Sequence, residues 1–123
     1  MIQVTPQMRI LVAVEPADFR KGIDGLTRVA REALSSDPFS GCVIVFRNRR
    51  ATAVKLLVYD NDGQGFWLCH KRLSTGRFRF WPDGRGARAS AKLEAHELAV
   101  LLSAGDYSAS GGAPQWRRVS AEA

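Results

Sequence analysis

Short runs of alternating apolar and polar residues fill the middle of the chain and predict β-strands. Residues 8–14 are rich in β-branched side chains and lie between two prolines, which indicates a first strand. Four further runs, 41–48, 53–60, 65–73 and 77–81, are joined by short Asn-, Ser- and Gly-containing turns, which require antiparallel neighbours. Residues 66–69 are apolar on both sides of their strand, which predicts a sheet covered on both faces or curled into a half-barrel that the helices close.

Apolar residues in the segment 19–34 recur with the spacing of one helical face, which predicts a helix after the first strand. Asp18 is a candidate N-cap for it. Gly22 and Gly25 are unfavourable inside a helix. Either another backbone or a phosphate approaches the first turn closely, or the helix starts after Gly22 and Asp24 is its cap.

A second helix is predicted over residues 91–104, with Ser90 as its cap and Gly105 at its C-terminal end. The composition of residues 108–123 is typical of a flexible tail. The chain is therefore expected to form a single α+β domain over residues 1–107. Its core is an antiparallel β-meander of about five strands, with one helix after the first strand and one at the C-terminal end.

Positive charge is concentrated in one part of this 123-residue chain. Ten of the eighteen Lys and Arg residues lie between Arg47 and Arg88, against three aspartates, while the remainder carries eight basic and nine acidic residues. Adjacent strands and turns would place these cations in one continuous patch on the sheet, interleaved with Tyr59, Trp67 and Trp81, which favours nucleic acid as a partner. The other interpretation is a solvated face that keeps the protein soluble.

The candidate nucleic-acid contacts are the basic residues of this patch and one aromatic residue that could stack on bases: Arg47, Arg49, Arg50, Lys55, Lys71, Arg72, Arg77, Arg79 and Trp81. Arg20 and Lys21 are possible additional contacts. No helix-turn-helix, zinc-finger or RNP signature is present, so recognition of a specific base sequence is not indicated.

Catalytic chemistry has little support in the sequence. His70 and His96 have no nucleophile placed beside them by a recognisable motif, and neither Cys42 nor Cys69 has a partner at zinc-ligand spacing. Both cysteines are expected to be buried, reduced thiols, with a cross-strand disulfide as the alternative. No cofactor and no metal are expected.

A metal-dependent nuclease would need several convergent carboxylates. Asp18, Asp24, Asp60 and Asp62 would supply them only if the fold gathers them. The segment 60–63 resembles the opening of a calcium loop, but no glutamate closes it. With neither a secretory signal nor an apolar run long enough to span a membrane, the chain is expected to be cytoplasmic.

Four segments of the sequence together match one known pattern: DFRKGIDGL (18–26), DPFSGCVIVFRNRR (37–50), VKLLVYDNDGQGFWLCHKRLSTGRFRFWP (54–82) and LEAHELAVLLSAGDY (93–107). They resemble the small accessory protein, often called TnpB, of the insertion-sequence-sixty-six group of bacterial transposable elements. The paired signatures RKGxDGL and KRLxxGRFxxWP carry most of the likeness, which spans about residues 8–107. The turn over 60–65 looks longer than the usual turn of the family.

The resemblance implies a cytoplasmic protein required for transposition and encoded beside a transposase that carries the catalytic residues itself. The resemblance identifies a process, transposition, but no chemical reaction, and it does not predict an oligomeric state. The first hypothesis is a non-catalytic accessory factor that contacts DNA through the basic sheet. The alternative is an adaptor that binds the transposase without independent DNA binding, which an apolar patch around residues 66–68 would favour.

Overall fold

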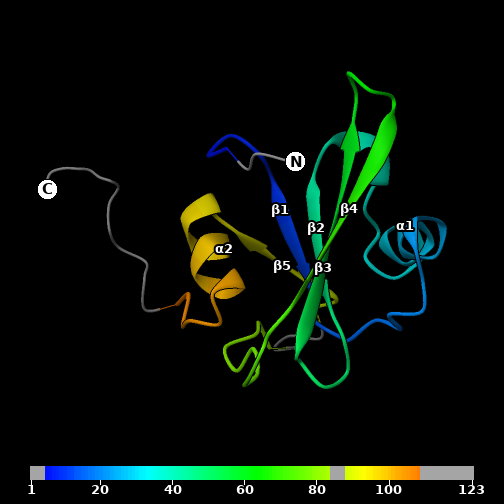
Figure 1. The fold of residues 1–123 in the computed structure, drawn as a ribbon. Helices are drawn as coiled ribbons and strands as arrows, with labels where there is room; N and C mark the ends of the chain where they lie inside the picture. The colour runs from blue at the N-terminus through cyan, green and yellow to red at the C-terminus, as the bar shows by residue number, and fades with distance from the viewer. Residues whose placement is uncertain (1–4, 84–87, 109–123) are drawn as a thin grey trace, which may run out of the picture.

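One five-stranded sheet with a helix on each face organises the protein (Figure 1). The computed structural model describes residues 5–83 and 88–108. In chain order the elements are β1 (Ile10–Ala13), α1 (Ile23–Glu32), the short 3-10 helix η1 (Pro38–Ser40), β2 (Val43–Arg47), β3 (Ala53–Asp60), β4 (Gly65–Arg72), β5 (Ser90–Leu93) and α2 (Ala95–Leu102). The part of the predicted tail that follows Ser108 lies outside the described residues.

The strand order is β4-β3-β2-β1-β5, and the sheet is open and mixed. β2, β3 and β4 form the predicted antiparallel meander. β1 runs parallel to β2, with Ile10 opposite Val43, and β5 pairs antiparallel with the other side of β1. The expectation of a purely antiparallel or half-barrel sheet was therefore wrong. The physical reason is α1, because a helix that crosses over between two strands returns the chain in the same direction.

The core has two layers, one on each face of the sheet. Ile10, Val12 and Val45 belong to the layer beneath α2, which contributes Leu98 and Leu101. Residues of the opposite parity on the same strands form the layer beneath α1: Ala13, Ile44, Phe46 and Leu57, with Leu26 and Ala30 from the helix. The prediction of a sheet covered on both faces is thus confirmed.

α1 begins at Ile23, with Gly22 at its N-cap position, so neither Asp18 nor Asp24 is the cap. The alternative is confirmed in that the helix starts after Gly22, but not in its choice of Asp24 as the cap. Gly25 lies in the first turn, where an added Cβ would be 2.8 Å from the Cβ of Lys21. The close approach of the preceding chain explains why a glycine is tolerated there.

Residues 77–81 do not form the predicted fifth strand of the meander. This part of the chain is irregular, and its hydrogen bonds go to the β2–β3 turn: the Phe78 N–H donates to the Ala51 carbonyl at 2.7 Å. Phe78 is buried as expected, but Phe80 is 43% exposed. Phe78 instead packs against Trp81, with ring centroids 6.2 Å apart.

The predicted helix over 91–104 is shorter, because its first residues form β5. Ser90 is thus a strand residue, and α2 starts after Glu94. There the Glu97 carboxylate accepts the Glu94 N–H at 2.8 Å, completing a capping box. Among the described helices, none is long and apolar enough to cross a membrane.

Cys42 and Cys69 are both free thiols, so the disulfide alternative is not realised. Cys42 is buried, and burial raises the pKa of its thiol. Cys69 is only half-buried, which departs from the expectation for that residue.

Candidate nucleic-acid interface

Four segments of the chain meet at the end of the sheet where β1 and β2 finish. The Ala17 N–H donates to the Arg47 carbonyl at 2.9 Å, and the Val14 N–H donates to the Ala89 carbonyl at 3.0 Å. The irregular segment after β4 is held to the β2–β3 turn through Phe78. Figure 1 shows these segments in the lower part of the view, away from the tip of the β3–β4 hairpin.

We call this region the basic end. It is defined by the loop 14–22, the turn 48–52, the segment 72–82 and residues 88–89. Its exposed cations come from all four segments: Arg20, Lys21, Arg49, Arg50, Arg72, Arg77, Arg79 and Arg88. Among them, Arg20 forms an ion pair with Asp18.

Asn48 orders the turn that presents Arg49 and Arg50. Its Oδ1 accepts the backbone N–H groups of Thr52 and Ala53 at 2.9 and 3.1 Å, and its Nδ2 donates to Thr52 Oγ1 at 2.9 Å. Three hydrogen bonds from one side chain fix the turn, in the manner typical of asparagine. The two arginines thus project from a defined platform.

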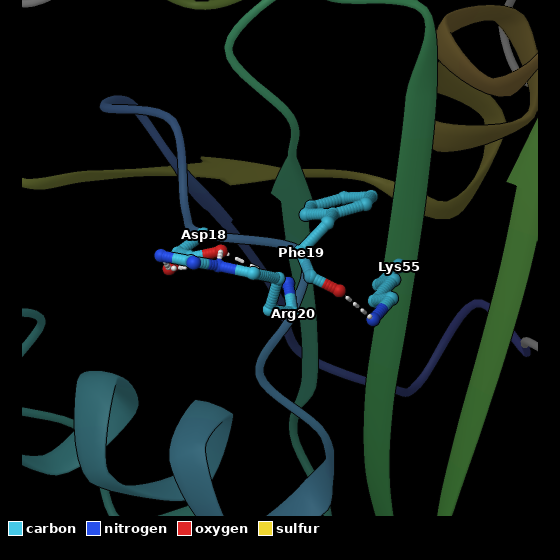
Figure 2. Close-up of polar contacts among 4 residues, drawn as sticks. All are labelled: Asp18, Phe19, Arg20 and Lys55. Atoms are coloured by element: carbon cyan, nitrogen blue, oxygen red, sulfur yellow. Dashed lines mark hydrogen bonds and ion pairs between the residues drawn. The ribbon is translucent and has the colours of Figure 1, made fainter.

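Lys55 does not contribute to the exposed surface. Its side chain is 8% exposed, and its ammonium donates to the carbonyls of Phe19 and Lys21 at 2.9 and 3.0 Å. Figure 2 shows Lys55 reaching from β3 to the Phe19 carbonyl, and the ammonium lies 4.9 Å from the Phe19 ring centroid. The predicted contact residue is thus an internal anchor that holds the loop carrying Arg20.

Arg20 turns away from that anchor and pairs with Asp18 (Figure 2). Its Nη2 lies 2.8 Å from Asp18 Oδ2, and its side chain is 92% exposed. The side-chain hydrogen bonds from Arg20 hold the pKa of Asp18 well below its usual range, so the carboxylate stays ionised. The pair brings little net charge, and Arg49 lines the same shallow hollow beside it.

Arg47 and Trp81 brace the basic end from within. The Trp81 indole N–H donates to the Ala13 carbonyl at 2.8 Å, and Arg47 Cζ lies 5.9 Å from the indole centroid. Arg47 Nη2 also donates to the Val14 carbonyl at 3.4 Å. Both residues are half-buried and already engaged, so their positions suit a scaffold better than a free stacking surface.

Lys71 and Arg72 lie on opposite faces of β4, because side chains alternate along a strand. The Lys71 ammonium donates to the carbonyl of Leu102, the last residue of α2, at 2.6 Å, where a cation compensates the helix dipole. Arg72 is exposed and points to the other face. The expectation of one patch across a sheet face is therefore corrected: the cations share an end of the sheet instead.

Arg88 is an exposed cation of the basic end that the sequence did not predict as a candidate contact. It was counted in the charge concentration, but it fell in a predicted loop with no assigned neighbour. The hydrogen bond of Ala89 to Val14 places it at the basic end. The position of Arg88 thus depends on the pairing of β5 with β1, which the sequence pattern did not predict.

The opposite end of the molecule carries a cluster of aromatic side chains. Phe39, Tyr59 and Phe66 form a cluster with ring centroids 4.9–5.2 Å apart, and Phe39 is 51% exposed. Trp67 projects from the other face of β4 and donates its indole N–H to Asp60 at 3.1 Å. We call these four aromatic residues the aromatic tip. The patch considered at residues 66–68 is thus split between two faces.

Among the described residues, no three His, Cys, Asp or Glu side chains are grouped so as to hold a metal ion. Asp18 lies at the basic end, whereas Asp60 and Asp62 lie in the β3–β4 turn, where Asp60 accepts backbone N–H groups. His70 is exposed, and its ring forms a T-shaped pair with the Phe19 ring, with centroids 5.7 Å apart. The carboxylates considered for a nuclease are therefore not brought together.

Comparison with known proteins places the chain in a family. The model of the IS66 Orf2-like proteins matches residues 8–111, and the chain belongs to that family. It is thus an insertion-sequence-associated accessory protein, of a family not known as catalytic.

Two curated relatives come from Sinorhizobium fredii (strain NBRC 101917 / NGR234). Uncharacterized protein y4jC is 35% identical over 107 residues, which cover 87% of this chain and 87% of the relative. Uncharacterized protein y4hO is 33% identical, over 87% of this chain and 89% of the relative. No solved structure matches the chain.

Proposed function

We propose that the protein is a non-catalytic accessory factor of transposition that contacts DNA through its basic end. The observation that carries the proposal is the convergence of exposed arginines from four segments on one end of the sheet. Like charges repel, so a fold that gathers so many of them at one end is best explained by an external polyanion. Phosphate groups of DNA supply that anion at regular spacing.

The geometry favours binding to the phosphate backbone rather than reading of bases. No described helix presents a row of side chains from the basic end, and apart from Arg72, the last residue of β4, its exposed guanidinium groups belong to turns and irregular chain. Arginine suits this role, because its planar fork donates two hydrogen bonds to one phosphate. We therefore expect binding with little sequence preference.

The first experiment titrates the full chain against fluorescent duplex DNA at several salt concentrations, without transposase. Each phosphate contact should lower log K by about 0.9 per unit of log salt, so four to six contacts give a slope of about −4 to −5. Binding that does not depend on salt, or no binding at low salt, would contradict the proposal.

A matched pair of variants localises the contact. Arg49→Gln with Arg50→Gln removes two charges from the turn that Asn48 orders. Arg28→Gln with Arg31→Gln removes the same charge from the exposed side of α1, outside the basic end. The first variant should flatten the salt slope by about two units and weaken binding, whereas the second should change only the long-range attraction. Equal effects would show that net charge, not the basic end, drives binding.

The alternative is an adaptor that binds the transposase without independent DNA binding. The observation in its favour is the aromatic tip, where Phe39 and Trp67 are exposed. Phe39→Ala with Trp67→Ala should then abolish binding to the element-encoded transposase, while Phe80→Ala, an exposed aromatic at the basic end, should not. Loss of transposase binding in a protein that shows no DNA binding alone would favour the adaptor over the first proposal.

A further inference from the structure

The two edges of the sheet are protected differently. β5 is an edge strand of four residues, whereas β4 is an edge strand of eight, and its register with β3 is unbroken from Ala53–Arg72 to Asp60–Gly65. β4 contains neither a proline nor a bulge, two of the devices that prevent pairing with another strand, and its charged residues Lys71 and Arg72 are confined to its last two positions. Within the described residues, nothing pairs with its outer side.

The hydrogen-bonding groups on this open side can be assigned from the register. The Leu73 N–H donates to the carbonyl of Thr52, the residue that the register places opposite it. Opposite residues in an antiparallel pair alternate between exchanging both hydrogen bonds and exchanging none. Odd-numbered residues of β4 therefore bond to β3. The backbone groups of Phe66, Leu68, His70 and Arg72 face outward.

Charge is distributed along β4 in a self-complementary way. The strand starts beside the turn that carries Asp60 and Asp62, and it ends with Lys71 and Arg72. The hydrogen bonds that Asp60 accepts lower its pKa, so it remains ionised. In an antiparallel pair of two identical strands, Lys71 and Arg72 of each strand lie on the side of the acidic turn of the other. Such an arrangement favours pairing with a second copy of this chain over a partner of arbitrary charge.

We propose that β4 pairs antiparallel with β4 of a second copy, about a twofold axis at Cys69, to form one continuous sheet. A twofold axis perpendicular to the sheet keeps each face continuous, so opposed residues come from the same face. The axis therefore lies midway between the two copies of one residue, which oppose each other directly. An axis at Cys69 opposes strand residues only, with Arg72 opposite Phe66 and Lys71 opposite Trp67. An axis at Leu68 would oppose Arg72 to Gln64, which lies in the turn with a φ of 54°.

This pairing makes a specific prediction for Cys69. As an odd-numbered residue it forms a non-hydrogen-bonded pair with its counterpart, with Cα atoms about 4.5 Å apart. That separation lies within the range of a disulfide. Cys42 is buried in the core of each copy and is unavailable for such a link.

The test uses the full chain without DNA, so its outcome is independent of the proposed DNA contact. Light scattering across a range of protein concentrations should show a dimer that dissociates on dilution. Mild oxidation with diamide should convert that dimer into a covalent one on a non-reducing gel. Cys69→Ser, with Cys42 intact, should abolish the cross-link but not the dimer. A monomer at every concentration, or a dimer that Cys69 does not cross-link, would overturn the proposal.

Charge reversal tests the register independently. Arg72→Glu should raise the dissociation constant of the dimer about ten-fold, because the change acts twice in a symmetric pair. Adding Asp62→Lys to Arg72→Glu should restore the original affinity. Arg28→Glu on the exposed side of α1 is the matched control and should leave dimerisation unchanged. Both test positions are exposed, so folding is preserved. Failure of Asp62→Lys to restore affinity would overturn the antiparallel register.

Discussion

The basic end and the aromatic tip lie at opposite ends of the same meander, yet they are built in different ways. The basic end assembles four segments that are distant in the sequence, and its exposed arginines rest on buried anchors: Lys55, Phe78 and the half-buried Trp81. The aromatic tip is local, formed by one hairpin and η1. A surface that gathers like charges needs a scaffold to hold it together, whereas an aromatic cluster stabilises itself.

This difference has a consequence for substitutions. At the basic end, the residues that stabilise the fold and those available to a ligand are separate sets, so stability and binding can be changed independently. At the aromatic tip, Phe39 and Trp67 are exposed and also packed against neighbours, so the two properties are coupled there.

The largest effect is expected at Phe78, which anchors the segment carrying Arg77 and Arg79. Its side chain is 2% exposed and packs in the layer beneath α2, and its N–H donates to Ala51. Phe78→Ala should lower the free energy of unfolding by about 3–5 kcal/mol, because it removes a large ring and leaves a cavity. Urea denaturation measures the change.

Phe80→Ala is the control, two residues further along the same segment. Phe80 is exposed, so its replacement should cost under about 1 kcal/mol. Equal costs at the two positions would mean that both side chains are buried on one side of a regular strand. That result would contradict the observed irregular chain.

A smaller effect is expected from the two lysines that donate to backbone carbonyls on opposite faces. Lys55→Met removes two charge-assisted hydrogen bonds at a buried position and should cost about 1.5–3 kcal/mol. It should also speed tryptic cleavage after Arg20, because the loop loses its anchor. Lys71→Met removes one exposed contact to the end of α2 and should cost under about 1 kcal/mol. A larger loss of stability for Lys71→Met than for Lys55→Met would contradict the assignment of Lys55 to the scaffold and of Lys71 to the surface.

Much of the meander was predictable because its signals are local. Period-two alternation and short turns fixed 53–60 to the residue, and 65–73 to within one residue of β4. The parallel pairing of β1 was missed, although the predicted crossover helix required it. Residues 77–81 alternate like a strand, but their hydrogen bonds go to a turn, which a local pattern does not contain. β5 was read as part of a helix because its partner, β1, lies far away in the sequence.

The candidate interface was predictable in composition but not in placement. The concentration of arginine was visible, whereas its location at one end of the sheet depends on contacts between distant segments. Lys55 shows the limit most clearly. Its alternation with Val54, Leu56 and Val58 placed it on the polar side of its strand. A local pattern does not show that two carbonyls of the loop after β1 receive its ammonium.

The smallest effect concerns the aromatic tip and depends on pH. Asp60 accepts the N–H groups of Gly63 and Asp62 and the indole N–H of Trp67 at 3.0–3.1 Å. The Gly63 hydrogen bond first, and then that of Trp67, lowers the pKa of Asp60 below its ordinary value of 3.8. Because the folded pKa is the lower one, the stabilisation is complete above 3.8 and is lost as the pH falls through the folded value.

We therefore expect the NMR resonance of the Trp67 indole N–H to stay constant as the pH falls to 3.8 and to shift only below it. Asp60→Asn should remove the shift, because the amide does not titrate, while Asp62→Asn should leave it in place. A shift centred at or above the ordinary value would mean that the indole and turn donors do not hold Asp60. The aromatic tip would then lack the local polar support that distinguishes it from the basic end, where the scaffold comes from distant segments.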